Sequence, residues 1–151
     1  MVKDAEEEPF DWCCQGRGGL DSWKSLGYIP VQDFEYKGFG TMTRSISRTL
    51  EYAYNDFCIS QIAAGLGKEA DRAKYTQRSG NWKNLFKVDQ VSLWLNGSDS
   101  GFVGFFQPRY LNKTWGFQDP LNCSYLDQFS ACSLQNNGRE TFESSIWEYG
   151  L

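Results

Sequence analysis

Two carboxylates near the end of the chain, Glu143 and Glu148 in the stretch TFESSIWEYG, are the first candidates for chemistry. A pair of carboxyl groups can serve as acid and base in glycoside hydrolysis, and aromatic rings pack against the C–H faces of sugars. The chain contains no histidine, which excludes a Ser-His-Asp triad, a Cys-His pair and an HExxH zinc site. Acid–base catalysis by these residues would therefore depend on Asp, Glu, Lys, Tyr or Cys.

The two glutamates have different interpretations. Ser145-Ile146-Trp147-Glu148 has the pattern of a helix capping box, in which the glutamate reaches back to the serine amide. On a helix, five residues at about 100° each place Glu148 roughly 140° from Glu143, so the two carboxylates would not converge. Glu143 is the candidate acid, against the alternative of a solvated loop carboxylate, and as an acid it needs a pKa raised by burial.

Composition argues against two classes of partner. The 151 residues carry a net charge of -4, without a basic region to hold a polyanion. No apolar run approaches the roughly 20 residues that a membrane-spanning helix needs. We therefore expect no nucleic-acid partner and no membrane span. Aromatic residues make up 17% of the chain, which suits sugar binding but more often reflects an aromatic core.

The sequence has features of the secretory pathway. Three N-glycosylation sequons begin at Asn96, Asn112 and Asn122 within one polar region. Among the five cysteines, we expect Cys123 and Cys132, which flank a short polar loop, to form a disulfide. We expect Cys58 to be a buried free thiol. The state of the adjacent pair, Cys13 and Cys14, is left open.

The N-terminal stretch MVKDAEEEPF has neither the basic nor the apolar region of a signal peptide. A secretory pattern without an export signal leads us to expect an internal piece of a larger secreted protein.

Two helices are predicted, and they are expected to pair. The first covers residues 43–66, where Ile46, Leu50, Ala53, Phe57 and Ala64 follow a period near 3.6. The second covers residues 68–86, with Ala70 and Ala73 on its apolar side and a kink or break at Gly80. Because only a short Leu-Gly-Lys turn separates them, we expect an antiparallel helical hairpin that needs further neighbours to cover its faces.

The remaining segments are predicted to be loops. Residues 16–40 hold many glycines and read as one long irregular segment, and residues 88–139 are rich in turn signals with a short hairpin near 102–106. NGSDSG at 96–101 partly matches a calcium loop but lacks EF-hand spacing, so we assign it no metal. Glu51 and Asp56 are interpreted as charges on the helix surface or in hairpin packing.

Three residues in or near the loops are candidates for sugar contacts. Arg109 can donate to hydroxyl groups, and Trp115 can stack on a sugar ring. Tyr28, in GYIP, is a similar candidate. Each has the alternative of ordinary packing.

Five segments in order carry a resemblance to a known family. They are SLGYIP (25–30), SRTLEYAYNDFCISQIAAGLGK (47–68), YTQRSGNWKNLF (75–86), GFFQPRYLNKTWGFQDP in the 101–120 region, and FESSIWEY (142–149). The helical hairpin alone is shared by several six-hairpin glycosidase families, but the ordered set resembles glycoside hydrolase family 92. That family consists of secreted or periplasmic α-mannosidases, and its fungal members are the most similar.

The resemblance implies a fold and a mechanism. Family members have an N-terminal β-sandwich followed by an (α/α)6 toroid, invert configuration, and use a calcium ion to bind and distort the terminal mannose. Their acid motif E-G-N-A-W-Q-Y corresponds here to residues 143–149, so Glu143 inherits the acid role and Trp147 a substrate-binding role. The general-base aspartate and a Gly-Asn-Glu motif of the family lie downstream of this motif and have no counterpart in the chain.

We therefore expect a mainly α fold in which residues 1–151 form part of an (α/α)6 toroid, without the β-sandwich and the C-terminal half of the toroid. The expected function is that of an inverting exo-α-mannosidase fragment, acting on α-1,2-linked terminal mannose of glycans, calcium-dependent, and inactive without the rest of its domain. The alternative is a helical-hairpin interaction or structural remnant that has lost catalysis.

Overall fold

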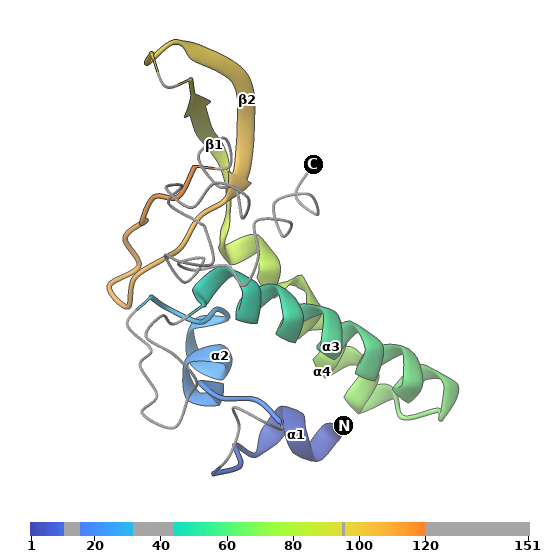
Figure 1. Cartoon of the computed structure of the whole chain (residues 1–151). Coiled ribbons are helices and arrows are strands. Elements are labelled where there is room, and N and C mark those ends of the chain that lie inside the picture. The colour runs from blue at the N-terminus through green and yellow to red at the C-terminus, as the bar shows by residue number, and fades with distance from the viewer. Residues whose placement is uncertain (11–15, 32–43, 95, 120–151) are drawn as a thin grey trace.

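The computed structural model describes residues 1–10, 16–31, 44–94 and 96–119, and about half of these residues are helical, with one small sheet (Figure 1). This agrees with the predicted mainly α composition, while the partial (α/α)6 toroid stays a prediction. The elements are α1 (Val2–Glu6), α2 (Leu20–Leu26), α3 (Ser45–Gly65), α4 (Glu69–Ser79), the 3-10 helix η1 (Gly80–Asn84), and the antiparallel strands β1 (Phe86–Leu93) and β2 (Asp99–Phe106).

Helices α3 and α4 pack side by side as the predicted hairpin (Figure 1). The chain reverses at Gly67, which adopts a left-handed conformation with φ of 67°. The predicted break at Gly80 is also confirmed, because α4 ends at Ser79 and η1 follows. The helix predicted to reach Phe86 was too long: glycine and asparagine are poor helix formers, and the chain enters β1 at Phe86.

The buried face of α3 differs from the predicted apolar stripe. Ile46 and Ala53 are buried, but Leu50 is half-buried and Phe57 and Ala64 are exposed. Six polar residues of the helix are buried as well: Ser45, Ser47, Arg48, Thr49, Asp56 and Ser60. A hydrophobic pattern does not detect such a face, because buried polar side chains such as Thr49 and Asp56 are hydrogen-bonded to partners elsewhere in the chain.

Helix α2 lies inside the segment that was predicted to be irregular. Gly19 and Gly27 flank it in left-handed conformations, with φ of 70° and 74°. Between them, Leu20 and Trp23 are buried against α3 residues. The prediction was wrong for this part because a seven-residue helix between glycines has too few turns to show a period. Residues 32–40 of the segment lie outside the described residues.

The β1–β2 hairpin extends the short one predicted near Phe102. Its register pairs Phe86 with Phe106 and Val91 with Val103, with irregularities between the paired positions. Phe105 and Phe106 join a buried cluster with Tyr28, Ile46 and Leu85. The base of the hairpin is thus anchored to α3, while its tip projects away from the helices (Figure 1).

Cys58 on α3 has a free thiol that is half-buried, whereas a buried thiol was predicted. The residue lies at the border between the buried and exposed faces of the helix. In the described ranges, no helix combines the length and the apolar character that crossing a bilayer requires.

Gly27 is predicted to be intolerant of a side chain. A Cβ at this position would approach the Asn84 Nδ2 atom to 2.7 Å, and the left-handed backbone disfavours any L side chain. We expect Gly27→Ala to lower the free energy of unfolding by roughly 2 kcal/mol, because it adds backbone strain and disturbs the Asn84 hydrogen bond to the Gly27 carbonyl. Denaturant unfolding would measure this.

The matched control is Gly65→Ala, since Gly65 ends α3 with nothing within 4 Å of its Cβ position. This change should be neutral or stabilising by about 0.5 kcal/mol. Equal effects of the two substitutions would contradict the prediction.

Candidate functional site

The described residues hold only some of the predicted site. Arg109, Trp115 and Tyr28 are described, as are the sequon asparagines Asn96 and Asn112. The other predicted site residues lie outside the described ranges: Glu143, Trp147, Glu148, Asn122, Cys123 and Cys132, together with Cys13 and Cys14.

Arg109 lies close to two aromatic rings. Its guanidinium carbon is 4.8 Å from the centroid of the Trp115 ring and 5.4 Å from that of the Tyr28 ring. Arg109 and Trp115 also pair as an antiparallel β-bridge. The structure therefore brings together the three residues that were predicted for sugar contacts. Tyr28 is far from the other two in the sequence: its hydroxyl bonds to the carbonyl of Tyr110, which lies 82 positions away.

The polar atoms of Arg109 hold the backbone of this region. Its Nε donates to the Lys113 carbonyl at 3.0 Å, and its Nη1 donates to the Asn84 carbonyl at 3.3 Å. The Tyr28 hydroxyl donates to the Tyr110 carbonyl at 2.9 Å. Burial raises the pKa of Tyr28, and the Arg109 charge opposes that rise only in part, so the phenol stays protonated as a donor.

The chemistry of this cluster is limited to binding and positioning. A guanidinium does not give up its proton in a protein, so Arg109 cannot serve as acid or base. Tyr28 is only 2% exposed and packs in the buried cluster with Leu85 and Phe105, so its ring does not make the predicted sugar contact. The half-buried Trp115 ring offers an apolar surface next to a positive charge, an arrangement that suits a sugar. The hydrogen bonds in place assign Arg109 first to holding the 109–115 turn against the end of η1.

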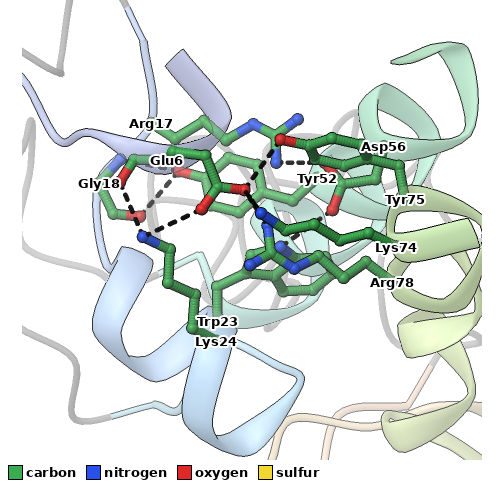
Figure 2. A network of polar contacts seen from close by, with 10 residues as sticks. All are labelled: Glu6, Arg17, Gly18, Trp23, Lys24, Tyr52, Asp56, Lys74, Tyr75 and Arg78. Carbon is green, nitrogen blue, oxygen red and sulfur yellow. Dashed lines mark hydrogen bonds and ion pairs between the residues drawn. The ribbon is translucent and has the colours of Figure 1, made fainter. Parts of the chain in front are cut away.

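A buried ion pair was missed by sequence reasoning. Asp56 on α3 is fully buried, and it accepts from Arg17 Nη1 at 2.7 Å and from Trp23 Nε1 at 3.2 Å (Figure 2). The surface or hairpin-packing interpretation of Asp56 was thus wrong, whereas Glu51 is exposed as interpreted. No spacing rule links positions 17 and 56, so the only available signal was a carboxylate on the inner side of a long helix.

Tyr52 completes this network from the next turn of α3. Its hydroxyl donates to the Gly18 carbonyl at 2.9 Å and accepts from the Gly18 amide at 3.0 Å. The Arg17 guanidinium lies 5.1 Å from the centroid of the Tyr52 ring, and Trp23 packs edge-on against the same ring. The GRGG segment, residues 16–19, is therefore held to α3 by the Arg17–Asp56 ion pair and by the hydrogen bonds between the Gly18 backbone and Tyr52.

Glu6 is the centre of a second network, between α1, α2 and α4 (Figure 2). Its carboxylate accepts from Lys74 at 2.8 Å, from the Tyr75 hydroxyl at 2.8 Å and from Arg78 at 2.7 Å, and Lys24 lies 3.5 Å away. Partial burial raises the pKa of Glu6, but the hydrogen bonds from Lys74, Tyr75 and Arg78 outweigh this and bring it to about 2. Such a carboxylate cannot donate a proton near neutral pH.

The described residues do not fit a calcium site. Within ranges 1–10, 16–31, 44–94 and 96–119, no three His, Cys, Asp or Glu side chains cluster closely enough to hold a metal ion. In the NGSDSG turn, the Asn96 Oδ1 accepts from Ser98 and the Asp99 Oδ1 accepts from the Gly101 amide at 2.8 Å. These oxygens serve the turn itself.

Comparison with known families identifies the chain. The sequence model of the glycosyl hydrolase family 92 catalytic domain matches residues 1–151. The chain belongs to glycoside hydrolase family 92. The predicted family is thereby confirmed. A protein of Arthroderma benhamiae named "Uncharacterized secreted glycosidase" is 63% identical over 148 residues, which are 98% of this chain and 19% of that protein.

Two solved family 92 structures from Bacteroides thetaiotaomicron are similar. The inverting mannosidase BT2199 matches with a TM-score of 0.58 and 24% identity, covering 78% of this chain and 13% of that one, which supports the fold. The α-mannosidase BT3965, in complex with mannoimidazole, matches with a TM-score of 0.50 and 25% identity, covering 73% and 12%. The chain thus spans about a fifth of the length of the Arthroderma benhamiae relative.

We predict that the buried ion pair dominates the stability of the packing between α2 and α3. Asp56→Asn leaves the Arg17 charge buried without its counter-ion, so the free energy of unfolding should fall by about 3–5 kcal/mol. The control is Glu69→Gln, because the Arg72–Glu69 pair at 3.2 Å has exposed side chains and should matter by less than about 0.5 kcal/mol. Similar small losses in both variants would refute this role.

Glu6 should make stability depend on pH in the acid range. Its pKa is about 2 in the folded state against 4.5 as the ordinary value, so its contribution is present above pH 4.5 and is lost as pH falls towards 2. The maximum contribution is roughly 3 kcal/mol. Unfolding measured from pH 6 to pH 2 should show a steeper fall for wild type than for Glu6→Gln. Parallel curves would contradict the prediction.

Proposed function

We propose that the chain is part of the catalytic domain of an inverting exo-α-mannosidase that removes terminal mannose from glycans. The observation that carries the proposal is the family 92 match over the whole chain. The two solved neighbours, both named as mannosidases, support the substrate class. The α3–α4 hairpin is consistent with one unit of an (α/α)6 toroid, of which residues 1–151 would form a part.

In this proposal Glu143 protonates the leaving glycosidic oxygen. Inversion requires a second carboxylate, roughly 6.5–9.5 Å away, to activate water on the opposite face of the sugar. That base and the remainder of the catalytic domain come from outside the chain, so residues 1–151 alone would be inactive. Trp147, four residues after the acid, would contact the sugar.

Arg109 and Trp115 are proposed to act together in substrate binding. Trp115 would provide a ring for the sugar to pack on, and Arg109 would position that ring, since it is stacked on Trp115 and bonded to two backbone carbonyls. The buried Tyr28 ring, 5.4 Å from the guanidinium carbon, is a second contact that limits its movement. A loss of Arg109 should therefore weaken substrate binding more than it slows the chemical step.

The cofactor and compartment follow from the family and the secreted relative. Calcium is proposed as the cofactor, and its ligands would come from residues other than those described, which do not fit it. Secretion is supported by the printed name of the 63% identical relative. A Cys123–Cys132 disulfide and a preference for α-1,2-linked mannose are part of the same proposal.

The test compares Glu143→Gln with Glu148→Gln in the complete protein, assayed with calcium on α-mannosides of different linkage. Loss of the acid should lower kcat by roughly 10²- to 10⁴-fold. Glu148→Gln should retain activity, since we assign Glu148 to a helix cap. Equal turnover of wild type and Glu143→Gln would remove Glu143 from the acid role.

An inactive wild type on every linkage would favour the second candidate, a helical-hairpin module that has lost catalysis. The observation on its side is that the polar networks around Glu6 and Asp56 hold helices together and leave no free acid–base pair between them. Under that candidate, the hairpin would be retained for packing alone.

A further inference from the structure

Two turns of the structure share one sequence pattern: an aromatic residue, Leu, Asn, any residue, then Ser or Thr. They are WLNGS at 94–98, at the tip of the β1–β2 hairpin, and YLNKT at 110–114, in the turn that Arg109 supports. Both asparagines are exposed. The third sequon, at Asn122, has Pro120 in place of the aromatic residue.

The two turns also share their backbone hydrogen bonds. In the first, the Trp94 amide donates to the Ser98 carbonyl at 2.9 Å and the Gly97 amide donates to the Trp94 carbonyl at 2.8 Å. In the second, the Tyr110 amide donates to the Thr114 carbonyl and the Lys113 amide to the Tyr110 carbonyl, both at 2.9 Å. This is the pattern of a three-residue hairpin loop that ends in a left-handed residue.

The left-handed residue follows the asparagine in each turn. Gly97 has a φ of 81°, and Lys113 has a φ of 68°. Lysine is disfavoured in this conformation, so the second turn adopts the geometry although its sequence opposes it.

The asparagine side chains are held in the same way. The Asn96 Oδ1 accepts from the Ser98 amide at 3.0 Å and from the Ser98 hydroxyl at 2.6 Å. The Asn112 Oδ1 accepts from the Thr114 amide at 3.0 Å and from the Thr114 hydroxyl at 2.6 Å. With each carbonyl oxygen turned to the hydroxyl, the Nδ2 atom, which carries an N-linked sugar, lies on the opposite side of an exposed amide.

An aromatic side chain stands at the start of each turn. Trp94 is 53% exposed and Tyr110 is half-buried, so part of each aromatic side chain is open to solvent. The Cα atoms of the first and fourth residues of such a turn lie within about 7 Å of each other, so the aromatic residue and the asparagine belong to one narrow turn. An aromatic ring two residues before the asparagine offers an apolar surface that the first sugar attached to Nδ2 could cover.

We propose that Asn96 and Asn112 carry N-linked glycans and that the first sugar of each packs on Trp94 and Tyr110, respectively. In the attachment step, Nδ2 forms a bond to C1 of the sugar, the C1–oxygen bond to a polyprenyl diphosphate donor breaks, and the amide loses one proton. The electron pair of the broken bond leaves with the diphosphate. The proposal rests on the secretory location given above, but not on mannosidase activity.

The first test measures attachment in the complete protein secreted from a eukaryotic host. Peptide mass analysis after treatment with an amidase that cleaves N-glycans should find aspartate at positions 96 and 112. Ser98→Ala and Thr114→Ala should each abolish one of the two modifications. An unmodified asparagine at either position of the secreted wild type overturns the proposal for that position.

The second test measures the sugar–ring contact through Tm. One sample of the glycoprotein is treated with an endoglycosidase that leaves the first sugar on the asparagine, and the other with the amidase that removes the whole glycan. Because the amidase converts the asparagine to aspartate, Asn96→Asp controls for the new charge. The Asn96 sugar is measured in a Thr114→Ala background, where Trp94→Leu, which keeps the sequon, should lower the rise in Tm to that of the double variant Ser98→Ala/Thr114→Ala, which carries neither glycan. The Asn112 sugar is measured in a Ser98→Ala background, where Tyr110→Leu should lower the rise to the same level.

A rise in Tm that stays above that of the double variant when Trp94→Leu or Tyr110→Leu is made in its single-sequon background would overturn the stacking part of the proposal. The same ring variants made without glycans, in a bacterial host, give the effect of the ring on the turn alone, which is subtracted. Activity separates this proposal from the enzyme assignment: a glycosylated but inactive protein would refute the mannosidase function only, and an active protein with bare asparagines would refute this inference only.

Discussion

The Arg17–Asp56 ion pair is the interaction on which the arrangement of the helices depends. Taking two charges out of water is costly, and close contact between them offsets this cost only when the remaining polar atoms also find partners. Asp56 meets that condition through the second hydrogen bond from the Trp23 indole. The pair therefore joins the GRGG segment (residues 16–19), α2 and α3 at one buried carboxylate.

Glu6 joins α1 to α2 and α4, and it loses less hydration than Asp56 does. Its carboxylate is about a quarter exposed, so desolvation is modest and several donors can approach it. Lys74 and Arg78 come from α4 and Lys24 from α2, while Tyr75 is fully buried and bonds to Glu6 through its hydroxyl. Burial raises the pKa of Tyr75, and the hydrogen bond to Glu6 raises it further. One network thus specifies a single buried geometry, and the other gathers short helices that have little stability of their own.

Sequence reasoning succeeded where structure is local. The α3–α4 hairpin and the break at Gly80 followed from apolar spacing and glycine, because these act within a few residues of the helix they shape. It failed for Asp56 and for α2, because their environment is set by partners far along the chain. For the candidate site, Arg109 and Trp115 were predicted as a hydrogen-bond donor and a stacking ring for a sugar. Their contact with Tyr28 could not be predicted, because it arises only from tertiary packing. Glu143 and Trp147 were assigned from a motif of the family and lie outside the described residues.

The distance along the chain between Arg17 and Asp56, 39 residues, has a consequence for the order of folding. The hairpin of α3 and α4 involves only neighbouring segments, and such contacts close quickly because little chain entropy is lost. An early hairpin would keep the Asp56 carboxylate hydrated, since a lone charge cannot leave water. The GRGG segment brings the counter-charge Arg17, and only then can water leave the Asp56 carboxylate. The inner face of α3 is therefore expected to lose its water after the hairpin has formed.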